Sequence, residues 1–132
     1  MLTKSNVFGS FSIDDLEAAA TFYGETLELK VDRSEMGGLD ITFGNGMQFF
    51  VYPKPNHKPA SFTVLHFEVD DIDSAVDELN SRGVVTKIYA DDEIPDMPPN
   101  DEKGIVRGGE DNPSMAWFKD PAGNVIAVME SK

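Results

Sequence analysis

The sequence of 132 residues contains no cysteine. This absence excludes disulfide bonds, thiolate nucleophiles, and zinc or iron–sulfur sites that use sulfur ligands. Basic residues are also scarce: 11 lysines and arginines stand against 24 aspartates and glutamates, and the formal net charge is −13. A chain with this charge repels a polyphosphate backbone, so nucleic acid is not an expected partner.

Long apolar runs are missing as well. The longest uninterrupted one extends from Val125 to Met129, far short of the roughly 20 residues that a membrane-spanning helix needs. The first six residues also lack an apolar stretch of signal-peptide length. We therefore expect a soluble, cytoplasmic protein without a membrane partner.

A ten-residue segment, from Phe11 to Ala20, returns 56 positions later as the segment from Phe67 to Val76. Each copy ends an alternating, strand-like pattern and continues with apolar residues at helical spacing. An Asp-Asp pair precedes each helical pattern, and aspartate is a preferred N-cap residue. Because the segment occurs only twice, the repeat predicts two copies of one small α+β module and not a solenoid.

Each copy is expected to contain a strand, a helix and three further strands. The Asn45-Gly46 pair predicts a tight hairpin, because both residues tolerate a positive φ, and Gly83 is placed to end the second helix. The expected strands are 7–13, 29–35, 39–43, 47–52, 62–69, 84–89, 114–119 and 124–129, and the expected helices begin at Asp14 or Asp15 and at Asp71.

We expect residues 1–132 to form one domain of two modules, about 6–53 and 61–130, joined by the proline-rich linker 53–61. A long loop, 91–111, interrupts the second module and holds 8 of the 24 acidic residues. This loop is either a solvated surface or, because loops of this length usually have a role, a lid over a cavity. The apolar residues available to anchor such a lid are Ile94, Met97, Ile105 and Val106.

The double strand-helix-strand-strand-strand pattern, the Phe22-Tyr23 pair and the turn at 118–124 resemble the vicinal oxygen chelate superfamily. This superfamily includes glyoxalase I, extradiol dioxygenases, fosfomycin-resistance enzymes and bleomycin-resistance proteins. The resemblance covers nearly the whole chain. It implies an α+β fold in which two βαβββ modules form cup-shaped mixed sheets. Because members of the superfamily commonly pair their modules across a two-fold interface, it also implies a homodimer.

The resemblance also implies where a metal would bind. Enzymes of the family use four inward side chains, one near the start of the first strand and one on the last strand of each module. In this sequence these positions are Phe8, Phe49, Val64 and Ala127, and none has an oxygen or imidazole donor. A shift of one residue, for example from Phe49 to Gln48 or Phe50, gives no better set. We therefore expect no metal and no other cofactor.

His66 is the best polar candidate, because it lies two residues after Val64 and should share its face. It could bind a ligand or act as a base with Glu68 tuning its charge, or it could be a half-buried structural histidine. A further alternative is a metal site that combines His66 and Glu68 with His57 or a carboxylate of the long loop.

Trp117 and Met115 alternate on one expected strand, which indicates either core or cavity wall, and the resemblance favours the wall. Ser10 occupies a place where fosfomycin-type relatives carry a hydroxyl. The full set of expected ligand-binding residues is Phe8, Ser10, Phe49, Val64, His66, Met115, Trp117 and Ala127.

The sequence thus favours a small-molecule-binding protein that sequesters or carries an organic ligand, cationic or aromatic, without a metal. Catalysis is not expected, because the metal-ligand positions of the family lack donor atoms. The alternative is a glyoxalase-type lyase, isomerase or dioxygenase whose metal ligands come from other positions.

Overall fold

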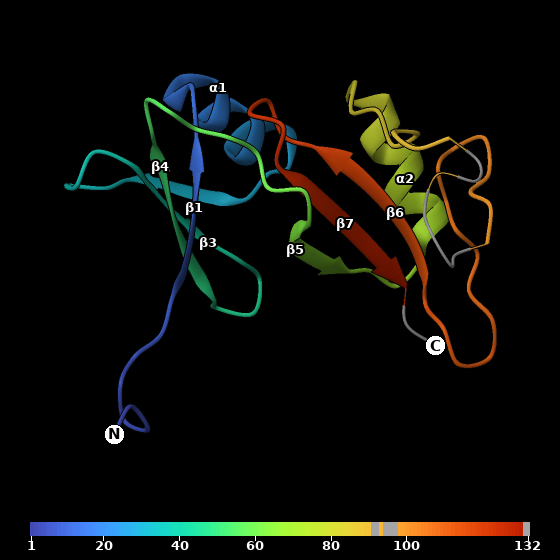
Figure 1. Cartoon of the computed structure of the whole chain (residues 1–132), viewed down its shortest axis with the longest axis horizontal. Helices are drawn as coiled ribbons and strands as arrows, with labels where there is room; N and C mark the ends of the chain where they lie inside the picture. Colours follow the sequence, from blue (N-terminus) through green and yellow to red (C-terminus); the bar gives the residue numbers. More distant parts are fainter. Residues whose placement is uncertain (91–92, 94–97, 131–132) are drawn as a thin grey trace. The chain divides into compact units, whose positions relative to one another are not determined.

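A computed structural model of the chain describes residues 1–90, 93 and 98–130 (Figure 1). The chain divides into two compact units, residues 1–59 and 60–132. Each unit contains a small sheet in which parallel and antiparallel pairs are mixed. The expected α+β class with two mixed sheets is therefore confirmed.

Unit 1 is built on a four-stranded sheet with the strand order β1-β4-β3-β2. β1 runs parallel to β4, and the other pairs are antiparallel. Asp15 begins the helix as predicted, because its carboxylate accepts a hydrogen bond from the amide of Ala18 at 3.1 Å. The elements are β1 (Gly9–Ile13), α1 (Leu16–Thr21), the π-helical turn η1 (Phe22–Thr26), β2 (Lys30–Arg33), β3 (Leu39–Thr42) and β4 (Gln48–Pro53).

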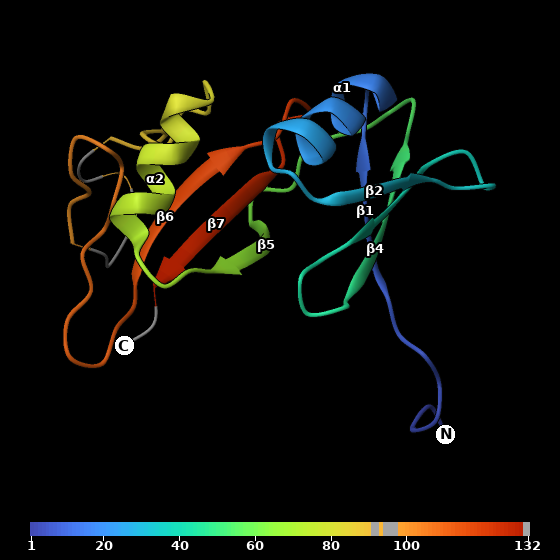
Figure 2. The same cartoon turned by 180° about the vertical axis from the view of Figure 1, so that it is seen from behind.

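Helix α1 lies on one face of this sheet, and the core of unit 1 forms between them (Figure 2). Tyr23 is fully buried, and its ring lies 6.0 Å from that of Phe11. The strand residues that complete this core are Ile13, Leu39, Ile41 and Val51. Burial of such side chains is the main favourable contribution to folding of a unit this small.

Unit 2 is built on a three-stranded sheet with β7 in the centre, parallel to β5 and antiparallel to β6 (Figure 1). Asp71 caps the helix as predicted by accepting a hydrogen bond from the amide of Ser74, and the carboxylate of Glu130 accepts a second one from the amide of Ile72. The elements are β5 (Thr63–Glu68), α2 (Ile72–Ser81), β6 (Ser114–Lys119) and β7 (Val125–Glu130).

Helix α2 crosses one face of the sheet and contacts β6 and β7 (Figure 2). Its buried side chains are Ile72 and Val76. Four consecutive residues of β7, from Val125 to Val128, are buried. Since successive side chains of a strand point to opposite faces, both faces of this strand are covered.

The strand predicted at 84–89 is wrong, because these residues form no regular strand in the structure. Side-chain hydrogen bonds hold the segment instead. The side-chain amide of Asn80 donates to the backbone carbonyl of Val84 and to Oγ1 of Thr86, both at 2.9 Å. The hydroxyl of Thr86 in turn donates to the carbonyl of Lys103 at 2.7 Å. These bonds replace the ladder that a strand would have made.

None of the helices in the described part of the chain has the length and apolar character that crossing a membrane requires.

Candidate functional site

The helix-free face of the unit 2 sheet brings together four of the residues expected from the sequence, His66, Met115, Trp117 and Ala127, and three of them form one row. His66 on β5 pairs with Ala127 on β7, and Ala127 pairs with Trp117 on β6. Paired residues of neighbouring strands point to the same face, so these three side chains form one row across the sheet. The apolar cluster that contains Trp117 and Ala127 includes no residue of α2, which places the row on the face away from the helix.

An apolar wall surrounds Trp117 on this face. The indole is 9% exposed and meets the ring of Tyr89 edge to face at a centroid distance of 5.8 Å. Burial, together with a smaller effect of the Glu93 carboxylate, raises the pKa of the Tyr89 hydroxyl, so this group is uncharged at neutral pH. The remaining members of the wall are Ile88, Val106, Met115, Val125 and Ala127.

The polar groups of this face lie at its edge, on β5. His66 and Glu68 are two residues apart and both are exposed, so the interpretation of His66 as a half-buried structural residue is wrong. Glu68 pairs with Met129, which pairs with Met115. An imidazole and a carboxylate thus flank an apolar wall, an arrangement that can orient a polar group of a bound organic molecule.

Val64 does not take the position predicted for it. The register between β5 and β7 shifts between Thr63 and Leu65, so that Thr63 pairs with Val125 and Leu65 with Ile126. Val64 consequently has no partner on β7, in the manner of a β-bulge. The sequence pattern contains no signal for this inserted residue.

In unit 1 the structure corrects the placement of Phe49. Its partner on β1 is Gly9, whereas Ser10 pairs with Phe50. The ring of Phe49 packs 6.0 Å from that of Phe11, on the face that α1 covers. A shift of one residue moves a side chain to the other face, so Phe50, not Phe49, shares the face of Ser10.

Phe8 is likewise not a sheet residue, since β1 begins at Gly9. Its side chain is 59% exposed. Phe8 therefore precedes the sheet, whereas the sequence had predicted it among the inward-facing residues of the first strand.

The helix-free face of unit 1 contains residues that sequence reasoning missed. The rings of Phe50 and Tyr52 stack at 5.7 Å with an angle of 14° between their planes. Ser12 pairs with Tyr52, and its hydroxyl lies 2.6 Å from Nδ1 of His57. The alternation that starts from Ser10 and continues to Ser12 could have indicated this face, had the hairpin register been known.

The donor set does not fit a divalent metal. Among the residues that the structure describes, no three histidine, aspartate or glutamate side chains are grouped closely enough to hold an ion. Within unit 1, Nδ1 of His57 lies 2.6 Å from the hydroxyl of Ser12. Metals of this class need several oxygen or imidazole donors at once.

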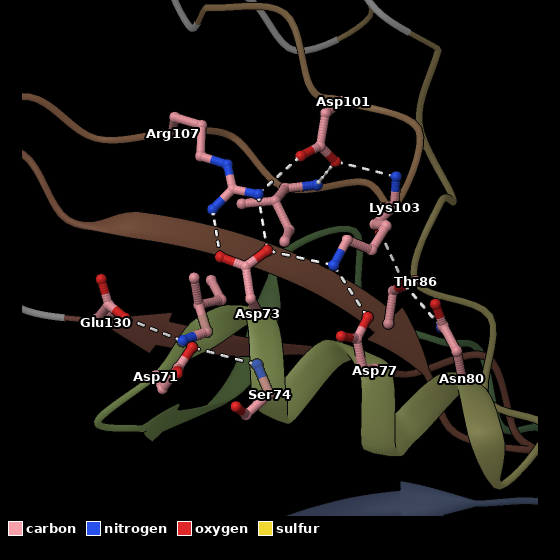
Figure 3. Close-up of polar contacts among 12 residues, drawn as sticks. Asp71, Asp73, Ser74, Asp77, Asn80, Thr86, Asp101, Lys103, Arg107 and Glu130 are labelled. Atoms are coloured by element: carbon pink, nitrogen blue, oxygen red, sulfur yellow. Dashed lines mark hydrogen bonds and ion pairs between the residues drawn. The ribbon is translucent and has the colours of Figure 1, made fainter.

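The described part of the acidic loop is tied to α2 by a group of ion pairs, which we call the loop clamp: Asp73, Asp77, Asp101, Lys103 and Arg107 (Figure 3). The guanidinium of Arg107 donates to both carboxylate oxygens of Asp73, at 2.7 and 2.8 Å. Lys103 donates to Asp73 at 3.2 Å and to Asp77 at 2.9 Å. Hydrogen bonds from Arg107 and then from Lys103 hold the pKa of Asp73 far below its usual range.

The structure describes two of the four apolar residues that were expected to anchor a lid. Ile94 and Met97 lie outside the described residues. Ile105 and Val106 are 0% and 2% exposed, and Val106 exchanges two backbone hydrogen bonds with Met115. This end of the loop therefore belongs to the core of unit 2 and to the wall beside Trp117, and is neither a solvated surface nor a free lid.

Comparison with known proteins agrees with this architecture. A crystal structure of a glyoxalase family protein from Bacillus anthracis is 24% identical, with 100% of each chain covered and a TM-score of 0.66. An antibiotic binding protein of a Streptomyces species is 22% identical (98% of this chain and 99% of that chain, TM-score 0.66). A fosfomycin resistance protein of Listeria monocytogenes is 9% identical (98% and 94%, TM-score 0.68).

At these identities the structural relatives show the fold alone. No curated protein sequence matched the chain significantly. The family model of the Glyoxalase/Bleomycin resistance protein/Dioxygenase superfamily, in contrast, matches residues 10–128. The chain belongs to this superfamily.

Proposed function

We propose that the protein binds a small organic molecule on the helix-free face of unit 2, without a divalent metal, and sequesters or carries it. The observation that carries this proposal is the row His66, Ala127 and Trp117 beside the contact between Trp117 and Tyr89. A mostly apolar and aromatic surface with a few polar groups is the usual composition of an organic-ligand site.

The charge of the chain favours a cationic ligand. The carboxylate of Glu68 lies on the same face as the wall, and the whole chain has a formal net charge of −13. A negative field raises the local concentration of cations, and the faces of aromatic rings attract them further. A flat cationic compound therefore combines both features of the site.

Two of the structural relatives support a small molecule as the ligand class. One is named as an antibiotic binding protein and the other as a fosfomycin resistance protein. Since one fold carries many functions, these names supply a ligand class for testing and no specific ligand.

Metal-dependent catalysis is not proposed, because the described residues provide no suitable donor set. We expect purified protein to contain no stoichiometric divalent ion. Elemental analysis after dialysis tests this directly, and about one zinc, nickel, manganese or iron per chain would contradict it.

The binding experiment compares thioflavin T, a flat cation, with an uncharged control compound. The control has the same benzothiazole and dimethylaminophenyl rings but lacks the methyl group on the ring nitrogen. We expect the cation to bind more tightly at low salt, with an affinity that falls as sodium chloride screens the charges. Isothermal titration calorimetry measures both dyes. Trp117→Ala should abolish binding, and Glu68→Gln should reduce the preference for the cation. Equal affinities for the two dyes would refute the electrostatic part, and no binding of either would refute the site.

We also propose that the protein is a homodimer. β1 and β5 lie at the edges of their sheets, and an unpaired edge offers backbone groups to another chain. Light scattering should give twice the chain mass of 14.5 kDa. The monomer mass at micromolar concentration would contradict the proposal.

A further inference from the structure

We infer that Lys103 and Arg107 are positioning residues for the proposed ligand site: by binding α2, they hold Val106 in the wall beside Trp117. This inference rests on the proposed function for its effect on affinity. Its effect on the surroundings of Trp117 does not depend on any ligand.

The segment 101–107 is a tight turn that closes on itself. The carboxylate of Asp101 accepts hydrogen bonds from the amides of Lys103 and Ile105, both at 2.9 Å. The amide of Asp101 donates to the carbonyl of Ile105, also at 2.9 Å. These bonds make the turn compact, and the contacts of Lys103 and Arg107 attach it to its surroundings.

The two cations of this turn attach it to α2. In Figure 3 the carboxylates of Asp73 and Asp77 project from the helix toward Lys103 and Arg107. Arg107 makes the two-pronged contact with Asp73 and a further one with Asp101 at 3.1 Å. Two parallel hydrogen bonds between a guanidinium and a carboxylate fix orientation as well as distance, so Arg107 sets the angle of the turn against the helix.

Two apolar side chains between Lys103 and Arg107 are buried, and one of them, that of Val106, belongs to the apolar wall beside Trp117. Ile105 is fully buried, and Val106 pairs with Met115 through backbone hydrogen bonds of 2.8 and 3.0 Å. Val106 also belongs to the apolar cluster of Trp117. Val106 is adjacent to Arg107 in the chain, so the contact between Arg107 and Asp73 ties the backbone next to Val106 to α2.

Unit 1 offers a matched ion pair without this connection. Arg33 binds both oxygens of Glu17 at 2.9 Å. Its side chain is 55% exposed, close to the 51% of Arg107. Arg33→Ala therefore measures the general effect of removing an exposed ion pair between an arginine and a carboxylate. Any additional effect of Arg107→Ala measures the positioning role.

The test uses Trp117, the single tryptophan of the chain, and acrylamide, an uncharged quencher of its fluorescence. We expect Arg107→Ala to raise the quenching constant about twofold, because a side chain now 9% exposed gains access to solvent when local structure opens. Val106→Ala, which removes part of the wall directly, should act in the same direction. Arg107→Lys should lie between Arg107→Ala and the unaltered protein, since lysine keeps the charge but loses the planar fork. Arg33→Ala should leave the constant unchanged.

Thioflavin T binding is then measured on the same variants. Arg107→Ala should weaken it about three- to tenfold, in the range of couplings between residues that share a network, and Arg33→Ala should not. If Arg107→Ala does not fold, the quenching test is made on the unaltered protein in 1 M sodium chloride, because salt screens the clamp without affecting acrylamide. Salt also weakens binding of a cationic dye, so Val106→Ala at low salt then replaces Arg107→Ala in the dye measurement.

Unchanged quenching in a folded Arg107→Ala protein, or in 1 M salt where that replaces it, would overturn the positioning role. Increased quenching with unchanged dye affinity would overturn the link to the ligand site. If the unaltered protein binds neither dye, the proposed function fails, and quenching alone decides whether the clamp positions Val106.

Discussion

Replacement of Gly104 by alanine is predicted to destabilise unit 2 through a backbone contact. Gly104 has a φ of 84°, in the left-handed region that costs an L-residue about 1 kcal/mol. A methyl group on this residue would also overlap the carbonyl oxygen of Thr86. A backbone atom cannot rotate away, so the 101–107 turn and the segment around Thr86 would have to separate.

The separation breaks the hydrogen bond from the Thr86 hydroxyl to the carbonyl of Lys103. Thr86 is 3% exposed, so the groups that lose their partner are buried, and each such loss costs about 1–3 kcal/mol. Together with the φ strain, we expect Gly104→Ala to lower the free energy of unfolding by about 3 kcal/mol.

Gly83→Ala is the matched control within the same unit. Gly83 has a φ of 83°, but a methyl group there would meet nothing within 4 Å, so this variant should lose only about 1 kcal/mol. Guanidinium denaturation followed by Trp117 fluorescence measures both variants. Gly104→Ala should lower the midpoint by about 1 M. Equal losses for the two variants would show that the contact with Thr86 is loose and would refute the reasoning.

Two further predictions concern charged groups. Asp120 is 5% exposed and accepts hydrogen bonds from the amides of Ala122 and Asn124, so Asp120→Ala should cost about 2–4 kcal/mol in the same denaturation assay; a loss under 1 kcal/mol would show that water replaces the carboxylate. Hydrogen bonds from Arg107 and Lys103 lower the pKa of Asp73 in the folded state, so its contribution is present above about pH 4 and is lost as pH falls toward the folded pKa. Unfolding at pH 5 and pH 2.5 should show a smaller pH dependence for Asp73→Asn than for the unaltered protein, and identical slopes would contradict this.

Local signals predicted the helix starts and the tight turns. Asp15 and Asp71 cap their helices because an aspartate side chain reaches an amide three residues ahead. The hairpin lies where it was predicted, but it is not a two-residue turn: the amide of Gly46 donates to the carbonyl of Phe43, and only Gly46, not Asn45, has a positive φ, of 87°. The Asn45 side chain accepts a hydrogen bond from the amide of Met47. These features depend on a few neighbouring residues, so the sequence contains all the information they require.

The sheet face to which each strand residue points was harder to predict from the sequence. The sequence located β4, but the prediction assigned Phe49 instead of Phe50 to the face of Ser10. The hydrophobic pattern could not decide between them, because both residues are phenylalanine and both faces of this strand carry aromatic rings. The inserted residue at Val64 had the same effect in unit 2, where one extra position changes the facing.

The sequence by itself determined the superfamily and the position of most helices and strands, because capping, turn chemistry and alternation act over a few residues. It also placed His66, Met115 and Trp117 correctly on β5 and β6. The tertiary structure alone decided that Val106 packs beside Trp117 and that Arg107 binds Asp73, 34 positions away in the chain. Such contacts depend on how the 101–107 turn packs against α2, and no local pattern carries that information.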